Sequence, residues 1–271
     1  MLRSLWVAKT GMDAQQANLD SISNNLANVS TTAYKRVRPI FEDLLYQNIR
    51  APGMNEDSAS YVPAGLQAGN GARIAATQRI NNAGSLVQSQ NPLDMAINGN
   101  GYFAVSTSNG VAYTRAGNFM RNDKGQIVTA SGNVLLGQSS ISSGSTGSAG
   151  IVIPSKATTV AIGTDGTVSY NLADATAPTQ ADQIAMVNFV NPTGLASAGG
   201  GLYYETMSSG EAQVGVAGKD GMGSITQFYT EQSNVNVAEE LVSLIAAQRA
   251  YEITAKSVSA SDQMLQKLGQ L

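Results

Sequence analysis

The side chains that perform most enzyme chemistry are missing from this chain of 271 residues. It contains no cysteine and no histidine. A thiolate nucleophile, a Cys or His metal site and a Ser-His-Asp triad therefore cannot form. Serine, lysine and carboxylate side chains are the groups that remain for catalysis.

The glycine-rich motifs do not fit a phosphate-binding loop. The run Gly99-Asn-Gly-Tyr-Phe-Ala104 imitates a dinucleotide fingerprint, but it leads into a predicted strand and offers no helix N-terminus to a phosphate. Gly218-Lys219 is followed by Asp220, where a P-loop requires Ser or Thr. No Ser lies three residues before a Lys, which excludes the Ser-x-x-Lys pattern of acyl-transfer enzymes.

Paired carboxylates are the one catalytic arrangement that the sequence leaves open. Asp123 and Asp165 lie in predicted turns, where Asp is common for conformational reasons. A glycan hydrolase built from two carboxylates that folding brings together stays an alternative, as does a secreted β-rich adhesin. We predict no catalytic residue, no cofactor and no metal site.

Seven-residue apolar repeats at both ends of the chain are a stronger signal than any of these motifs. Such a repeat keeps one seam of a helix facing a partner helix. We predict that the repeats lie at subunit interfaces; the alternative is a pair of helices packed within one domain. Gln248 and Asp262 interrupt the second repeat. The predicted interface residues are Leu5, Met12, Leu19, Ile22, Leu26, Val29, Val237, Leu241, Leu244, Tyr251, Val258, Leu265 and Leu268.

Glycine and proline separate these ends from the middle of the chain. Of 28 Gly, only Gly11 and Gly269 lie in segments 1–35 and 235–271, and all 7 Pro lie between those segments. Because Gly and Pro disfavour helix interiors by about 1 and 3 kcal/mol relative to Ala, the ends are predicted as long helices. The first should run from near Leu2 to about Val29. The last should begin beside a capping Asn236 and continue close to Leu268.

The middle of the chain is predicted to consist of short strands. Turns such as Asn98-Gly99 and Asn109-Gly110 separate apolar runs, and Asp165-Gly166 marks the clearest hairpin. Segment 139–150 is rich in Ser and Gly and is predicted as a surface loop. The expected strands are Met95–Ile97, Tyr102–Val105, Val111–Thr114, Ile127–Thr129, Thr158–Ile162, Thr167–Tyr170, Ile184–Val190 and Leu202–Thr206.

The predicted fold class is α+β. Residues 1–35 and 235–271 would form a helical assembly domain, with the terminal helices packed as a coiled-coil layer. Residues 36–75 would be an extended arm, because 47–75 has Pro, Gly and few apolar side chains, and residues 76–234 would be an inserted, mainly-β domain. We expect the ends to be poorly ordered in the free subunit and to fold on assembly, because a lone helix leaves its apolar seam in water.

Composition limits the partners. A net charge of −3 gives no reason to expect nucleic acid or a membrane surface. No apolar run approaches the roughly 18 residues needed to span a bilayer. The first ten residues lack a charged lead followed by a long apolar core, so no cleavable secretory signal is expected.

The end of the first helix resembles a family signature. The run Asn24-Asn-Leu-Ala-Asn-Val-Ser-Thr-Thr-Ala-Tyr-Lys-Arg36 is similar to that of bacterial flagellar rod and hook proteins. Ala33 stands where the family usually has Gly, so we do not expect a positive φ there. Ser233–Val242 and Gln248–Glu252 resemble the family's C-terminal signature. The signature residues matched are Asn24, Leu26, Asn28, Thr31, Tyr34 and Lys35.

Within the family, segments 41–47 and 63–71 most resemble the members that form the distal rod. The resemblance implies a structural subunit, not an enzyme, that is exported uncleaved by the flagellum's own type III pathway. Subunits would stack helically into a hollow shaft that spans the periplasm and passes torque from motor to hook. Implied neighbours are copies of itself, proximal rod proteins, hook or hook-cap subunits, the ring bushings and the export apparatus. Another axial subunit, proximal or hook-like, stays an alternative.

The resemblance also implies a role for the segment after the first helix. A stretch corresponding to about Tyr46 to Pro63 is present in distal rod members and absent from hook subunits. We predict that this arm, with Tyr46, Pro52, Gly53 and Pro63, stiffens the shaft by reaching a neighbouring subunit.

Overall fold

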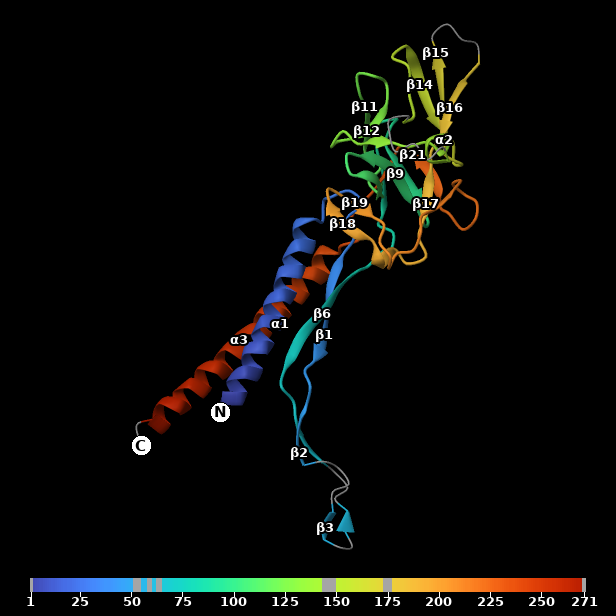
Figure 1. Ribbon diagram of the computed structural model, residues 1–271. Coiled ribbons are helices and arrows are strands. Elements are labelled where there is room, and N and C mark those ends of the chain that lie inside the picture. The colour runs from blue at the N-terminus through green and yellow to red at the C-terminus, as the bar shows by residue number, and fades with distance from the viewer. Residues whose placement is uncertain are drawn as a thin grey trace. The chain divides into compact units, whose positions relative to one another are not determined.

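The computed structural model describes residues 2–50, 55–57, 60–61, 65–142, 150–172 and 177–269 (Figure 1). The chain forms two compact units. One, here the helical unit, contains Met1–Ala27, Val37–Arg79 and Asn236–Leu271. The other, here the β unit, contains Asn28–Arg36 and Ile80–Val235. The chain therefore passes from one unit to the other four times.

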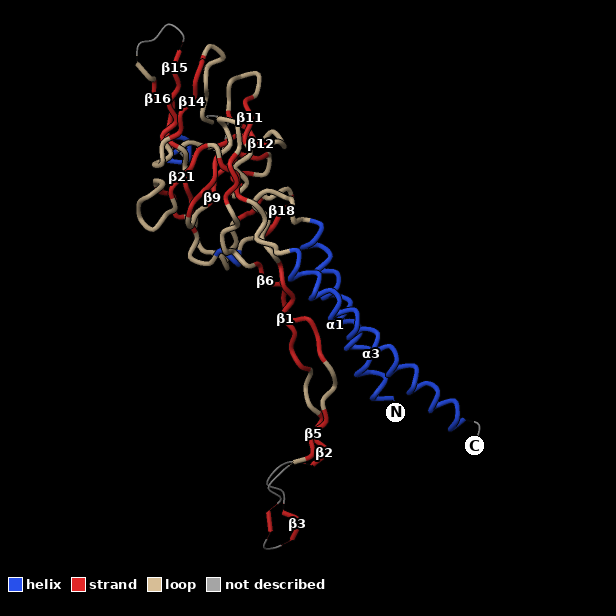
Figure 2. Tube along the Cα trace, turned by 180° about the vertical axis from the view of Figure 1, so that it is seen from behind, coloured by secondary structure: helices blue, strands red, loops and turns tan. Residues whose placement is uncertain are grey.

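Two long helices and a strand hairpin make up the helical unit. Helices α1 (Leu2–Ala27) and α3 (Val237–Gly269) lie side by side, as both ribbon views show (Figures 1 and 2). These bounds confirm the two predicted helices. Asn236 caps α3, because its Oδ1 accepts a hydrogen bond of 3.1 Å from the Ala238 N–H. Glu239 and Glu240 lie in the first turn of α3, where their negative charges interact favourably with the positive end of the helix dipole.

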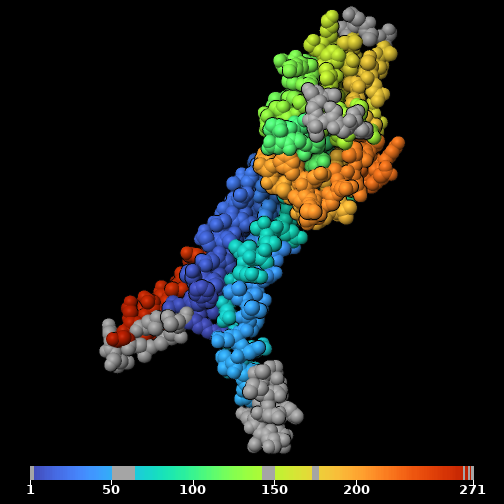
Figure 3. Space-filling view, viewed as in Figure 1, coloured from blue at the N-terminus to red at the C-terminus, as the bar shows by residue number. Residues whose placement is uncertain are grey.

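The hairpin follows α1 and lies along it. Strand β1 (Val37–Asp43) pairs antiparallel with β6 (Ala72–Arg79), with an irregularity in register between Ile40 and Phe41. Figure 3 shows the blue surface of α1 adjoining the lighter blue and teal surface of these strands. Farther out, β2 (Gln47–Arg50) pairs with β5 (Leu66–Ala68), and β3 (Asn55–Asp57) pairs with β4 (Ser60–Tyr61).

The β unit is built on a nine-stranded antiparallel sheet with the order β11-β12-β13-β9-β10-β19-β18, in which β17 pairs with β9 and β20. Its strands are β9 (Tyr102–Thr107), β10 (Gly110–Thr114), β11 (Phe119–Arg121), β12 (Ile127–Thr129), β13 (Val134–Leu135), β17 (Met186–Asn188), β18 (Ala196–Gly199), β19 (Leu202–Tyr204) and β20 (Gln213–Gly215). Most of the predicted strands are confirmed here.

Smaller elements complete the β unit. A three-stranded sheet has the order β14-β15-β16, and two strand pairs join β21 to β8 and β22 to β7. The predicted Asp165-Gly166 hairpin connects β14 and β15. The elements are β7 (Leu86–Gln88), β8 (Met95–Asn98), α2 (Gln138–Ser142), β14 (Ala157–Ile162), β15 (Thr167–Leu172), β16 (Thr179–Gln183), the 3-10 turn η1 (Pro192–Gly194), β21 (Ser224–Gln227) and β22 (Tyr229–Glu231).

Two apolar clusters form the core of the β unit. The larger includes fully buried Phe103 and Phe119, whose rings meet edge to face with centroids 5.4 Å apart. The smaller gathers Tyr102, Tyr113 and Phe189, again in edge-to-face contact. Edge-to-face rings add about 0.5–1.5 kcal/mol per pair beyond their burial. The β unit therefore has the dense interior of an independent domain.

The predicted fold class is wrong in the form stated. Antiparallel strands dominate the described chain, in seven separate sheets, and helices are confined to the two ends and the short α2. The segment predicted as an extended arm consists of a succession of strand pairs from β1 to β6. Its strands escaped prediction because the second half of β1 and the middle of β6 are exposed at consecutive residues, so the alternation that marks a half-buried strand is lost there. The predicted loop at 139–150 begins within α2, and 143–149 lie outside the described residues.

Candidate assembly surface and buried ion network

Helices α1 and α3 pack antiparallel over several turns. A Cβ placed on Gly11 would lie 3.7 Å from the Thr254 methyl group. Fourteen residues later on α1, Asn25 Nδ2 lies 3.5 Å from Glu240 Oε2, which is fourteen residues earlier on α3. Equal spacings on the two helices fix one register for the whole pair.

The face of α3 turned to α1 is lined by small and polar residues at a spacing of seven. Glu240, Ala247, Thr254 and Ser261 recur at that spacing; Thr254 is half-buried, and the other three are buried. Small side chains let the two backbones approach closely. The predicted interface residue Leu241, and the positions that follow it at a spacing of seven, each lie one residue after a member of this buried series.

The structure places the predicted interface residues in three environments. Ile22 is buried within the helical unit. Val237, Leu241 and Tyr251 are exposed by 36–44%. The side chains of Leu265 and Leu268 lie outside the described residues. Those that are half-buried are Leu5, Met12, Leu19, Leu26, Leu244 and Val258 on the helices, and Val29, which follows α1 in the β unit. Their role between subunits stays a prediction.

A second apolar stripe on α3, which the sequence reasoning missed, points away from α1. Val242, Ile245 and Ile253 are 68, 50 and 67% exposed. At 100° per residue Val242 and Ile245 lie roughly opposite the Glu240 series, and Ile253 lies about 100° to one side of it. Their spacing of three and eight residues is itself a helical signal that could have revealed the stripe.

A hollow of about 620 Å³ opens between the start of α1 and the end of β1 in the helical unit. Trp6 and Tyr46 are more than half exposed beside it, and Leu45 is 89% exposed. Arg73 on its wall pairs with Glu42 at 3.2 Å. The lining residues are Trp6, Asp43, Leu44, Leu45, Tyr46, Asn70 and Arg73.

Buried Asn25 fixes the hairpin to α1. Its Oδ1 accepts a hydrogen bond of 3.0 Å from the Val37 N–H, and its Nδ2 donates to the Val37 carbonyl at 2.8 Å. Ser21 Oγ donates to the same carbonyl at 3.1 Å. Asn25 thus holds both the N–H and the carbonyl of the first residue of β1, and it also contacts α3. Its neighbour Asn24, a predicted signature residue, is exposed.

The remaining signature residues lie just beyond α1 in the β unit. Thr31 Oγ1 donates to Asn28 Oδ1 at 3.1 Å, and Tyr34 is half-buried. Ala33 has a φ of 56°, so the expectation of an ordinary φ at this position was wrong. Its N–H donates to the Glu231 carbonyl at 2.8 Å, a contact that helps to hold this left-handed residue in place.

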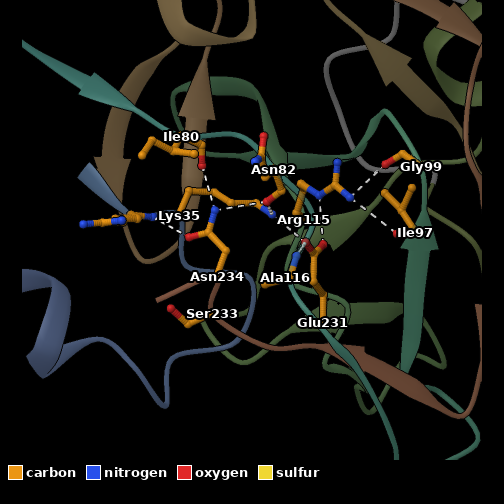
Figure 4. A network of polar contacts seen from close by, with 12 residues as sticks. Lys35, Ile80, Asn82, Ile97, Gly99, Arg115, Ala116, Glu231, Ser233 and Asn234 are labelled. Carbon is orange, nitrogen blue, oxygen red and sulfur yellow. Dashed lines mark hydrogen bonds and ion pairs between the residues drawn. The ribbon is translucent and has the colours of Figure 1, made fainter. Parts of the chain in front are cut away.

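Lys35 belongs to a buried ion network (Figure 4). Glu231 Oε1 accepts from Lys35 Nζ at 2.5 Å and from the Gly84 N–H at 2.9 Å. Glu231 Oε2 accepts from Arg115 Nε at 2.9 Å. The three charged side chains are at most 6% exposed. One carboxylate therefore joins three distant parts of the chain inside the β unit.

Backbone carbonyls satisfy the other protons of the two cations. Arg115 donates to the carbonyls of Gly99 at 2.9 Å and Gly101 at 3.2 Å, and Lys35 Nζ donates to that of Asn82 at 2.8 Å. Burial lowers the pKa of Lys35 against the attraction of Glu231. Burial acts to raise the pKa of Glu231, but Arg115 and Lys35 together hold that pKa below its usual value. The two cations therefore favour the ionised form of the Glu231 carboxylate, and that carboxylate in turn opposes the effect of burial on Lys35.

Asn234 extends the network to the backbone where segments of the β unit begin and end. Its Oδ1 accepts from the Arg36 N–H at 2.7 Å, and its Nδ2 donates to the carbonyls of Ile80 at 2.8 Å and Asn82 at 3.1 Å (Figure 4). Arg36 is the last residue before the hairpin, Ile80 is the first after it, and Asn234 lies three residues before the start of α3. Within the β unit, Asn234 therefore joins the segments at which the chain enters and leaves that unit.

Neither the hollow beside Trp6 nor a second one of similar size in the β unit has the carboxylate pair of a hydrolase among the described residues of its lining. The first has Asp43 alone, and the second, also about 620 Å³, lies beside β14 with Arg121 and Phe228 on its wall and no acidic residue. Among the described residues, no three Asp or Glu side chains are grouped closely enough to hold a metal ion. No helix within the described ranges is both long and apolar enough to cross a bilayer.

Sequence comparisons agree with this arrangement. Residues 5–35 match the family described as flagella basal body rod protein. Residues 96–170 match the flagellar hook protein FlgE/F/G D1 domain, and residues 226–271 match the C-terminal part of the flagellar basal body rod FlgEFG proteins.

Curated relatives match over the full length. The chain is 48% identical to the flagellar basal-body rod protein FlgG of Buchnera aphidicola subsp. Acyrthosiphon pisum, with all of both chains covered. It is 47% identical to FlgG of Buchnera aphidicola subsp. Schizaphis graminum over the same extent, and 42% identical to FlgG of Caulobacter vibrioides over all of this chain and 99% of the relative. The chain therefore belongs to the family of flagellar basal-body rod proteins.

Proposed function

We propose that this chain is a structural subunit of the distal flagellar rod, and that it stacks helically with copies of itself into a rigid hollow shaft that passes torque from motor to hook. The relatives named FlgG support the rod assignment, because they match from end to end. Membership of this family favours a structural role over the adhesin and hydrolase alternatives.

The contrast in burial between the two units carries the proposal of self-assembly. Of the apolar side chains buried in the described chain, only Ala14, Ile22 and Ala247 belong to the helical unit. The same unit holds 15 of the 22 large apolar side chains that are exposed. Ordering a residue costs about 1–2 kcal/mol in backbone entropy, which so small an interior cannot offset. The helical unit therefore needs further apolar contacts, and copies of itself supply them.

Different surfaces of the helical unit would meet in such a polymer. The exposed stripe of α3 and the hollow beside Trp6 are unlike each other, so contacts between them would be head-to-tail and would continue without closing. In the proposed shaft the terminal helices line the inner wall and the β unit faces outward. The polymer would lie in the basal body, cross the periplasm and receive its subunits, uncleaved, through the flagellar export apparatus.

Its neighbours would be proximal rod proteins at one end, hook-side proteins at the other and the surrounding ring bushings. The arm at residues 46–63 would distinguish this stiff shaft from a flexible hook. Tyr46 is 53% exposed and available to a neighbour, whereas Pro52, Gly53 and Pro63 lie outside the described residues.

Imaging of the purified full chain at high concentration tests both parts of the proposal. The intact protein should form straight hollow tubes. A variant lacking residues 46–63 should still form tubes, but these should bend. Dispersed particles from the intact chain would refute self-assembly, and straight tubes from the deletion variant would refute the stiffening role of the arm.

A further inference from the structure

The hollow beside Trp6 has one acidic residue in its lining, Asp43, together with Arg73 and Asn70. Asp43 lies in the hollow's lining and, within the described ranges, has no ion-pair partner, whereas the neighbouring Glu42 is paired with Arg73. The rest of the lining includes exposed Leu45 and Tyr46. A volume of about 620 Å³ is in the range of sites that hold several apolar groups. The hollow thus suits an apolar partner that carries a positive charge.

The outward stripe of α3 has that composition. Ile245, Arg249 and Ile253 follow one another at four-residue spacing, so they lie on one face and span roughly 12 Å along the helix. Both isoleucines are at least half exposed, and Arg249 is exposed without an ion-pair partner in the described parts of the chain. An arginine between two isoleucines matches an apolar hollow with one carboxylate.

The stripe cannot fill the hollow of its own subunit. The hollow adjoins α1, and the stripe lies on the side of α3 opposite to α1. We infer that the Ile245-Arg249-Ile253 stripe of one copy packs into the Trp6-Leu45-Tyr46 hollow of the next copy, where Arg249 pairs with Asp43. This inference rests on the proposed self-assembly and names the two surfaces that meet. Such a contact joins unlike surfaces and propagates into a filament.

Charge reversal in the full-length protein tests the pairing. Arg249→Glu and Asp43→Arg each place like charges together and should raise the concentration required for tube formation at least about tenfold, since like charges at an interface are repelled. The double variant restores opposite charges and should recover tube formation to within about threefold of the intact chain. Sedimentation measures the polymer, and electron microscopy confirms its form.

A matched control uses the exposed turn of the β unit. Asp123→Arg combined with Lys124→Glu makes the same exchange of charges away from the inferred contact, and this variant should assemble as the intact chain does. Circular dichroism of each monomer checks that the fold is kept. The inference would be overturned if the two single variants assembled normally. It would also be overturned if the double variant assembled as poorly as the more defective single variant. If the intact chain forms no tubes, the proposed function itself fails.

Discussion

Lys35 Nζ lies 2.5 Å from Glu231 Oε1, although 196 positions separate the two residues along the chain. Lys35 follows α1 closely, and Glu231 ends the last strand before α3. The two chain segments that lead to the terminal helices are therefore fastened together inside the β unit. In the proposed shaft, this fastening would resist the separation of the two segments when force acts on either terminal helix.

Replacement of Glu231 by Gln should strongly destabilise the β unit. The variant keeps the shape of the side chain but leaves Lys35 and Arg115 buried without a counter-charge. Loss of one partner from a buried ion network costs about 3–5 kcal/mol in the free energy of unfolding. Urea unfolding followed by circular dichroism measures the change. Glu211→Gln, at an exposed site in the same unit, should stay within about 0.5 kcal/mol of the intact chain.

The contribution of Glu231 should disappear in acid. Because the pKa of Glu231 in the folded chain lies below its usual 4.5, the folded state holds its proton less tightly than the unfolded state. Its stabilisation is therefore complete above pH 4.5 and is lost as the pH falls through the folded value. The difference in unfolding free energy between the intact chain and Glu231→Gln should shrink below pH 4.5. A difference that stays constant down to pH 3 would contradict the assigned direction.

Ala33 should tolerate Gly and reject Val. At a φ of 56° the left-handed backbone conformation costs an L-residue about 1–2 kcal/mol of conformational free energy, and it costs a β-branched residue more. Ala33→Val should lower the unfolding free energy by about 2 kcal/mol or more. Ala33→Gly should leave it within about 1 kcal/mol, because relief of strain offsets the greater entropy of the unfolded chain and the lost methyl contact. Thermal melting of the two variants side by side decides this; equal melting temperatures would argue against a left-handed Ala33.

Leu244→Asp should block polymerisation while the β unit stays folded. Leu244 is half-buried on the side of α3 that packs on α1, and a carboxylate there opposes the pairing of the helices. The near-ultraviolet circular dichroism of the β unit should be unchanged, and sedimentation should find no polymer. Met207→Asp, at a fully exposed site of the β unit, is the matched control and should assemble normally. Normal tubes from Leu244→Asp would show that this seam is not needed for assembly.

The ends of the fold could be predicted from the sequence because two independent signals coincide there. Both α1 and α3 are marked by the scarcity of Gly and absence of Pro and by the seven-residue repeats. Asn236 marks the N-terminal cap of α3. The phase of the α3 seam could not be predicted in the same way. Hydrophobicity favours Leu241 as the seam residue, yet the residue that contacts α1 is Glu240, through Asn25. Apolar residues surround much of α3, so composition alone does not tell which face pairs within the chain.

The buried ion network left no local signal. Lys35 was recognised only through the resemblance of its surroundings to a family signature, and neither Arg115 nor Glu231 lies in a motif. Charged residues are usually exposed, so their burial becomes visible only when folding brings the three together. The outward stripe of α3, by contrast, is periodic in sequence and could have been found beside the predicted seam.

Amide hydrogen exchange, measured on the dilute monomer and on the assembled tube, tests the central claim most directly. The claim is that the helical unit completes its interior only through neighbouring subunits. We predict that amides at residues 5–29 and 237–265 exchange rapidly in the monomer and slowly in the tube, while those of β9 and β10 are protected in both. Strong protection of residues 5–29 in the dilute monomer would contradict the claim.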